Sequence, residues 1–174
     1  IEDKLHLQVI DDRAFVDPIA MAVHDGKAYV VSQTTDQLFV TDGTRVEAHP
    51  TDDGPRVIAV SDDGTLVIGY AFTAALTVQK GEATRRMSGP RGARAIAVHK
   101  GVAYVTGDVD DDLWAIDLAA GAVLWRAAVA PNPRALAVND ASVAVGSEQA
   151  GCIERFDRAS GKRLAVIAPN KQTR

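Results

Sequence analysis

The feature of this sequence that most limits its possible folds is a repeat of about 38 residues that occurs four times. An alanine near the end of a short apolar run recurs at intervals of 37, 38 and 40 residues, at Ala22, Ala59, Ala97 and Ala137. A glycine after a later run recurs at intervals of 38, 40 and 40 residues, at Gly43, Gly81, Gly121 and Gly161. Because two independent landmarks share one period, the chain contains four copies of one structural unit.

Residues 93–129 show the content of one unit most completely. They contain four short alternating runs, at 95–98, 102–106, 113–117 and 123–129, and no helical pattern. Turn-forming residues separate these runs, namely Lys100-Gly101, the acidic segment 108–112 and Ala119-Ala120-Gly121. Short strands joined by such turns predict a four-stranded antiparallel meander.

A meander of this size cannot cover both of its own faces, so the units must stack on one another. A four-stranded repeat of this length is typical of a β-propeller blade, because radially stacked sheets cover each other's faces. We therefore predict an all-β fold of four consecutive blades within one domain, residues 1–174, with blades at 18–50, 55–88, 93–130 and 133–168. The recurring alanine lies in the first strand of each unit, which predicts that first strands line the crowded axis.

The number of outer strands indicates whether the propeller closes. Each unit ends in a fourth strand, and one additional run of the same character lies at residues 4–10. The surplus strand predicts an open arc of a larger propeller, and a closed four-blade ring is the alternative. An open arc exposes apolar residues on its two end blades, which favours self-association or the presence of further blades. We expect these residues to be Met21, Val23, Leu136 and Val138.

Several motifs are similar to those of a known group of repeats. They are the strand entries Pro55-Arg-Val-Ile-Ala-Val and Pro133-Arg-Ala-Leu-Ala-Val, and the turns Ile116-Asp-Leu-Ala-Ala-Gly-Ala-Val-Leu-Trp and Phe156-Asp-Arg-Ala-Ser-Gly-Lys-Arg-Leu. Through them the sequence resembles bacterial YVTN-type and PQQ-like β-propeller repeats. The resemblance implies a periplasmic or extracellular setting. It implies no single function, because the family contains both binding scaffolds and quinoprotein enzymes.

The composition narrows the classes of partner. The chain carries 19 Lys and Arg against 23 Asp and Glu, so a general electrostatic attraction to nucleic acid is not expected. No apolar run approaches the length of a membrane span. Cys152 is the single cysteine, which excludes an internal disulfide and a thiolate metal cluster. The sequence also lacks a haem-attachment motif and a phosphate-binding glycine loop, so we expect no cofactor.

Three arginines occupy the same repeat position, where each first strand begins. They are Arg56, Arg94 and Arg134, and Ile19 holds this position in the first repeat. In a propeller these residues surround the mouth of the axial channel, and a guanidinium suits the recognition of a carboxylate or phosphate. The alternative, which we favour, is that they pair with nearby aspartates between blades, because unpaired buried charge is rare.

The aspartates Asp108, Asp110 and Asp112 have the alternate spacing with which a loop presents carboxylates to calcium. No glycine follows at the turn position, and Ala119 stands where a bidentate acid closes a calcium loop of the helix-loop-helix type. A solvated acidic loop is therefore the favoured interpretation, and the three aspartates are only weak candidates for a metal site.

The remaining candidates belong to loops at the same rim. Tyr70 and Phe72 are expected in the loop between second and third strands, and Arg91 and Asn132 in the connections between blades. Two aromatic residues in one loop point to a contact surface. The aromatic residues Trp114 and Trp125, in contrast, lie on strands and are expected to pack between blades.

No catalytic residue is predicted, because Cys152 has no recognisable partner and no serine lies in a nucleophile elbow. We therefore predict a non-catalytic propeller scaffold that binds a protein or a small anionic ligand through its loop rim. The alternative is a fragment of a propeller enzyme, either a PQQ-like dehydrogenase or a lactonase-type metal hydrolase. Such a site requires acidic or amide ligands that converge on the axis, whereas the axial positions here carry arginine and small apolar residues.

Overall fold

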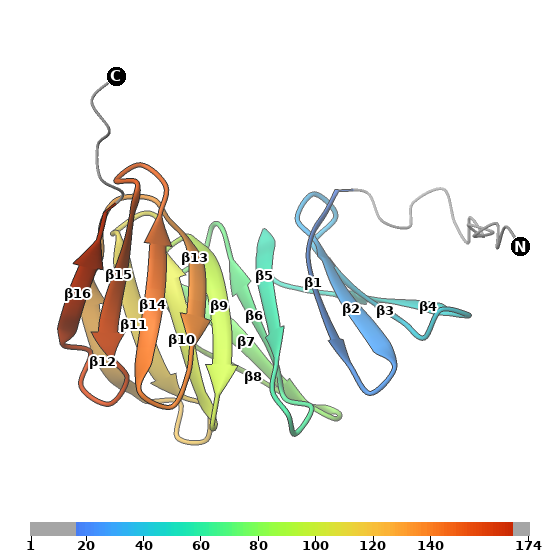
Figure 1. Cartoon of the computed structure of the whole chain (residues 1–174). Helices are drawn as coiled ribbons and strands as arrows, with labels where there is room; N and C mark the ends of the chain where they lie inside the picture. The colour runs from blue at the N-terminus through green and yellow to red at the C-terminus, as the bar shows by residue number, and fades with distance from the viewer. Residues whose placement is uncertain (1–16, 169–174) are drawn as a thin grey trace, which may run out of the picture.

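The computed structural model describes residues 17–168, which form four antiparallel sheets of four strands each (Figure 1). The first sheet contains β1 (Pro18–His24), β2 (Lys27–Ser32), β3 (Gln37–Thr41) and β4 (Val46–Pro50). The second contains β5 (Pro55–Val60), β6 (Leu66–Tyr70), β7 (Ala75–Lys80) and β8 (Ala83–Ser88). The third contains β9 (Ala93–His99), β10 (Val102–Gly107), β11 (Asp112–Asp117) and β12 (Val123–Ala128). The fourth contains β13 (Pro133–Val138), β14 (Ser142–Ser147), β15 (Cys152–Asp157) and β16 (Arg163–Ile167).

In every sheet the strands pair in chain order, so each sheet is one antiparallel meander and forms one blade. The innermost strands contact one another in succession, β1 with β5, β5 with β9 and β9 with β13. The predicted fold class, an all-β propeller segment of four four-stranded blades, is confirmed. The run at residues 4–10, predicted to be an additional outer strand, lies outside the described residues.

The core consists of three apolar clusters, each of which fills the gap between two consecutive blades. Val31 and Leu38 of the first blade meet Ile58 and Ile68 of the second. The next two clusters join the second blade to the third and the third to the fourth, and they are represented by Leu76 with Trp114 and by Tyr104 with Phe156. Within residues 17–168 no such cluster joins the fourth blade to the first, so the described blades form an open arc.

The two ends of the arc expose different surfaces. Met21 and Val23 on β1 are each 65% exposed, as predicted for the outer face of the first blade. The prediction for the last blade is wrong, because Leu136 and Val138 pack against the cluster between the third and fourth blades.

The physical reason for this error is that equivalent positions of a repeat face the same way. Leu136 and Val138 hold the positions of Met21 and Val23, so both pairs point toward the preceding blade. The alternate residues Ala135 and Ala137 face outward on β13 and are exposed.

None of the described residues forms a helix with the length and apolar character needed to cross a membrane.

Candidate binding site at the axial mouth

A β-bulge near the start of each first strand fixes the direction of one side chain per blade. The strand register shifts between Pro55 and Val57 in β5, and the same irregularity occurs in β1, β9 and β13. A bulge inserts one residue that bends the strand and re-aims its own side chain. The residues at these positions are Ile19, Arg56, Arg94 and Arg134, so the three predicted arginines occupy one structural position.

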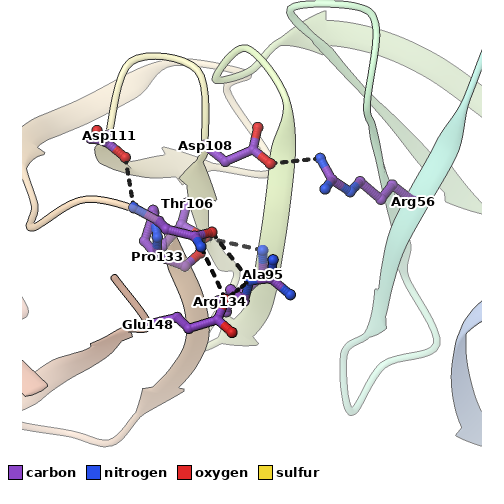
Figure 2. Close-up of polar contacts among 9 residues, drawn as sticks. Arg56, Ala95, Thr106, Asp108, Asp111, Pro133, Arg134 and Glu148 are labelled. Atoms are coloured by element: carbon purple, nitrogen blue, oxygen red, sulfur yellow. Dashed lines mark hydrogen bonds and ion pairs between the residues drawn. The ribbon is translucent and has the colours of Figure 1, made fainter. Parts of the chain in front are cut away.

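Arg56 forms an ion pair with the next blade. Its Nη1 atom donates to Asp108 Oδ2 at 2.8 Å, and the side chains of the two residues are 20% and 23% exposed (Figure 2). The backbone N–H of Asp108 donates to Gly92 O at 3.0 Å, which holds the carboxylate at the rim. This contact between the second and third blades is the pairing that the sequence analysis favoured.

Arg134 is held inside its own blade. Its Nε atom forms an ion pair with Glu148 and also donates to Asn132 Oδ1 at 3.1 Å. Asn132 Nδ2 donates to the same Glu148 Oε2 at 3.0 Å, so the three side chains form a closed triangle. Glu148 follows β14 directly, as Asp108 follows β10, and therefore the two carboxylates hold equivalent positions.

Arg94 lies between these two pairs and differs from them. No carboxylate among residues 17–168 forms an ion pair with its guanidinium. Burial lowers the pKa of Arg94, and the positive charges of Arg56 and Arg134 lower that pKa further, whereas Asp108 and Glu148 act in the opposite direction more weakly. The mouth thus holds three guanidinium groups and two engaged carboxylates, which leaves one positive charge without a partner in the described part of the chain.

The frame around the mouth is fixed by contacts to the backbone. Thr106 Oγ1 accepts from Ala95 N at 3.0 Å and donates to Pro133 O at 3.1 Å, which ties the third blade to the start of the fourth. Asp111 Oδ1 accepts from Asn132 N at 2.9 Å. Figure 2 shows the contacts of Thr106 and of Asp111. The arginines therefore extend from a rim whose loops are joined across blades.

The three aspartates with alternate spacing do not converge on a common point. Asp108 pairs with Arg56, and Asp110 Oδ1 lies 3.4 Å from Arg91 Nη1. The third carboxylate, Asp112, accepts from Trp114 Nε1, and burial raises the pKa of Asp112. No group of three metal-ligating side chains occurs among the described residues.

The two aromatic candidates have different environments. Tyr70, which the sequence analysis placed in a loop, is the last residue of β6 and only 1% exposed, and its hydroxyl lies 2.7 Å from Thr77 Oγ1. Burial also raises the pKa of the Tyr70 phenol. Its ring therefore packs in the core between the first and second blades. Phe72 is 68% exposed at the rim, as a contact residue must be.

Sequence reasoning missed Glu148 and the bulges. Glu148 lacks an acidic equivalent in the first two repeats, where Gln33 and Ala71 follow the second strands, so no repeated acidic signal marks the position. The bulges leave a trace in the sequence, because arginine interrupts an otherwise apolar strand at the same place three times.

The two tryptophans pack between blades as predicted, Trp114 toward the second blade and Trp125 toward the fourth.

The fold is similar to β-propeller domains in several solved structures. One is hydrazine synthase from Kuenenia stuttgartiensis, with a TM-score of 0.80 and 14% identity, covering 91% of this chain and 52% of that one. Another is virginiamycin B lyase from Staphylococcus aureus, with a TM-score of 0.77 and 13% identity, covering 90% and 57%. A third is a nidogen/laminin complex, with a TM-score of 0.78 and 15% identity, covering 95% and 68%.

These similarities define the class of protein by its fold alone: the chain forms an arc of a β-propeller. It spans about half the length of the first two structures. No protein-family model matches the chain, and no curated protein matches its sequence. The similar structures include both enzymes and a protein that binds another protein, so they leave the function to be argued from the site.

Proposed function

We propose that this chain is a non-catalytic binding scaffold whose axial mouth receives an anionic group. The observation that carries the proposal is Arg94, a partly buried guanidinium between Arg56 and Arg134 with no carboxylate partner among residues 17–168. A partly desolvated arginine that repels two neighbours is stabilised when an anion enters the site. Arg56 and Arg134, which are each paired with a carboxylate, then flank the anion and fix its orientation.

The ligand class follows from the same geometry. A guanidinium offers a planar pair of donors that matches a carboxylate or a phosphate. The anion belongs either to a small molecule or to an acidic side chain of a protein, and Phe72, Arg91 and Asn132 provide further contact surface on the rim. The resemblance to YVTN-type and PQQ-like repeats supports a bacterial extracytoplasmic setting for this scaffold.

The alternative, that the chain is a fragment of a propeller enzyme, has no comparable support. Asp108, Asp110 and Glu148 each pair with an arginine at the rim, so their carboxylates are engaged rather than directed at a common centre. A metal hydrolase site requires several such ligands on one ion. We therefore propose binding as the role of this mouth.

Replacing Arg94 with glutamine is expected to weaken anion binding about tenfold, the effect of losing one charge-assisted hydrogen bond. Inorganic phosphate at constant ionic strength is the probe, and the arginine Nε–H signals in the NMR spectrum report the binding. We expect the Arg94 signal to shift most in the unchanged protein.

Arg155→Gln is the matched control, because Arg155 is an exposed arginine of β15 and lies away from the mouth. It should leave the phosphate affinity unchanged. If the Arg94→Gln variant binds phosphate as tightly as the unchanged chain, the proposed anion site is refuted.

The ends of the arc support a second proposal, namely that two copies associate head to tail. At the first two internal interfaces the alternate residues of one first strand pack toward the large residues of the next, as Ala22 packs toward Ile58 and Val57 toward Ile96. The outer face of β13 offers Ala135 and Ala137, and the outer face of β1 offers Met21 and Val23. The last blade of one copy therefore complements the first blade of another.

Light scattering is expected to give a solution mass near twice the 18.4 kDa of one chain, because the same contact formed twice closes the two arcs into a ring of eight blades. The double variant Met21→Lys with Val23→Lys should return the mass to that of a monomer, because two charges cannot be buried unpaired in an apolar interface. Lys27→Glu, a charge change at an exposed position of β2, serves as the control. A monomeric mass for the unchanged chain contradicts self-association.

A further inference from the structure

A cavity of about 570 Å³ lies between the second and third blades, on the face of the arc opposite the arginines. It is bounded by the turns that join first to second and third to fourth strands. Its lining combines an apolar wall with charged side chains of both signs, and these residues are Val78, Val98, Leu118, Lys80, Arg85, Lys100, Asp62 and Asp63. This volume and this mixture of surfaces are typical of small-molecule sites, which span about 300–1,000 Å³.

The next interface shows what normally fills this space. Trp125 on β12 is paired with Ala115, whereas Arg85 on β8 is paired with Val78, and these two pairs are equivalent in the repeat. The Trp125 indole packs against the cluster between the third and fourth blades and donates from Nε1 to Arg158 O at 3.0 Å. An arginine therefore replaces, in the second blade, an indole that closes the same gap in the third.

The turn glycines show how the gap between the second and third blades differs from the gap between the third and fourth. A Cβ atom added to Gly161 would lie 2.5 Å from Trp125 Cε3, so the indole sits directly on that turn. At the equivalent Gly121 the only nearby atom is Met87 Cε, at 3.9 Å. The space that an indole occupies in one interface is thus open in the other.

Among the three basic side chains that line the cavity, Arg85 is the one that forms no ion pair within the described residues, so an anion is favoured there. Lys80 Nζ lies 2.6 Å from Asp63 Oδ2, and this contact is the main reason that the pKa of Asp63 is lowered. Lys100 pairs with Asp140 of the fourth blade. The Arg85 guanidinium contacts Ala119 O at 3.0 Å, as the indole N–H contacts Arg158 O, but within the described residues it pairs with no carboxylate.

We propose that this cavity binds a small aromatic carboxylate. The aromatic ring takes the place that the Trp125 indole holds in the next interface and packs on Val78, Val98 and Leu118. The carboxylate accepts from the Arg85 guanidinium, which carries positive charge at the edge of an otherwise apolar space. The site is independent of the axial mouth, because it lies at the other end of the blades and shares no residue with it.

The test uses the full chain and indole-3-acetate as the probe, followed by amide NMR. Binding is expected to shift the amide signals of Leu118, Ala119 and Gly101. Arg85→Gln should weaken binding about tenfold through loss of the charged hydrogen bonds. Arg85→Trp should abolish binding, because it supplies the indole that fills the equivalent gap, and the rest of the spectrum should be retained.

Tryptamine, which carries the same ring with a positive charge, is the ligand control and should not bind. If Arg85→Trp fails to fold, Arg85→Glu replaces it, since this exposed position of β8 tolerates a charge and the reversed charge should abolish binding. The proposal is overturned if Arg85→Trp or Arg85→Glu retains the affinity for indole-3-acetate, or if tryptamine binds equally well. It is also overturned if the shifted amides lie at the axial mouth.

Discussion

Replacing Phe156 with alanine is expected to lower the free energy of unfolding by about 3–5 kcal/mol. The Phe156 ring is 1% exposed and belongs to the cluster between the third and fourth blades, with Tyr104, Val143 and Val145. Its removal leaves a cavity that rigid sheets on both sides cannot close by collapse. Urea denaturation followed by circular dichroism measures the loss.

The matched control for this substitution is Leu124→Ala on β12 of the third blade. Leu124 is 53% exposed and lies at neither end of the arc, so the same kind of truncation should cost less than about 1 kcal/mol. Equal losses for the two variants would show that the third and fourth blades are not packed through this cluster.

Removing the positive charge of Arg163 is expected to cost about 3 kcal/mol, because it leaves a buried carboxylate without its partner. The side chain of Glu154 is 3% exposed, and its Oε1 atom lies 2.9 Å from Arg163 Nε. Oε2 of the same residue accepts from Ala130 N, and Arg163 Nη2 donates to Ala128 O at 2.8 Å. The Arg163→Met variant keeps the apolar stem of the side chain and deletes these polar contacts, together with the contact of the guanidinium with the Phe156 ring at 5.7 Å from its centroid.

A double-mutant cycle separates the charge from the packing. Adding Glu154→Gln to Arg163→Met should recover part of the loss, because a neutral amide is cheaper to bury than an unpaired carboxylate. Arg155→Met, at the exposed neighbouring position of β15, should change the free energy of unfolding by less than about 0.5 kcal/mol. If Arg163→Met costs no more than Arg155→Met, the ion pair does not stabilise the last blade.

The blades could be predicted from the sequence because their determinants are local. Alternation with a period of two marks the strands, and the recurring turn glycines mark where each meander reverses. The direction of each face was harder to predict, because alternation alone does not say which neighbour a face meets. Comparing Leu136 with Met21 across repeats resolves it, since equivalent residues face the same side.

The candidate site was predicted only in part, because its contacts join residues far apart in the chain. The arginine series could be read from the repeat, whereas the partner of Arg56 lies in another blade and that of Arg134 in its own. Tyr70 was misplaced because its end of β6 gives no local sign of burial. The cavity beside Arg85 depends on which side chains are absent from a gap, and the sequence becomes informative only when Arg85 and Trp125 are aligned.

The bulge at the start of each first strand sets one residue, which serves ligand recognition, apart from the residues that pack the blades together. Its side chain lies outside the alternation that assigns the rest of the strand to one neighbouring blade or the other, so it can change without moving any core residue to the wrong face. Isoleucine and arginine already occupy the position in different blades of this chain. A propeller of this type can therefore diversify its ligands during evolution by one substitution per blade, with little loss of stability at each step.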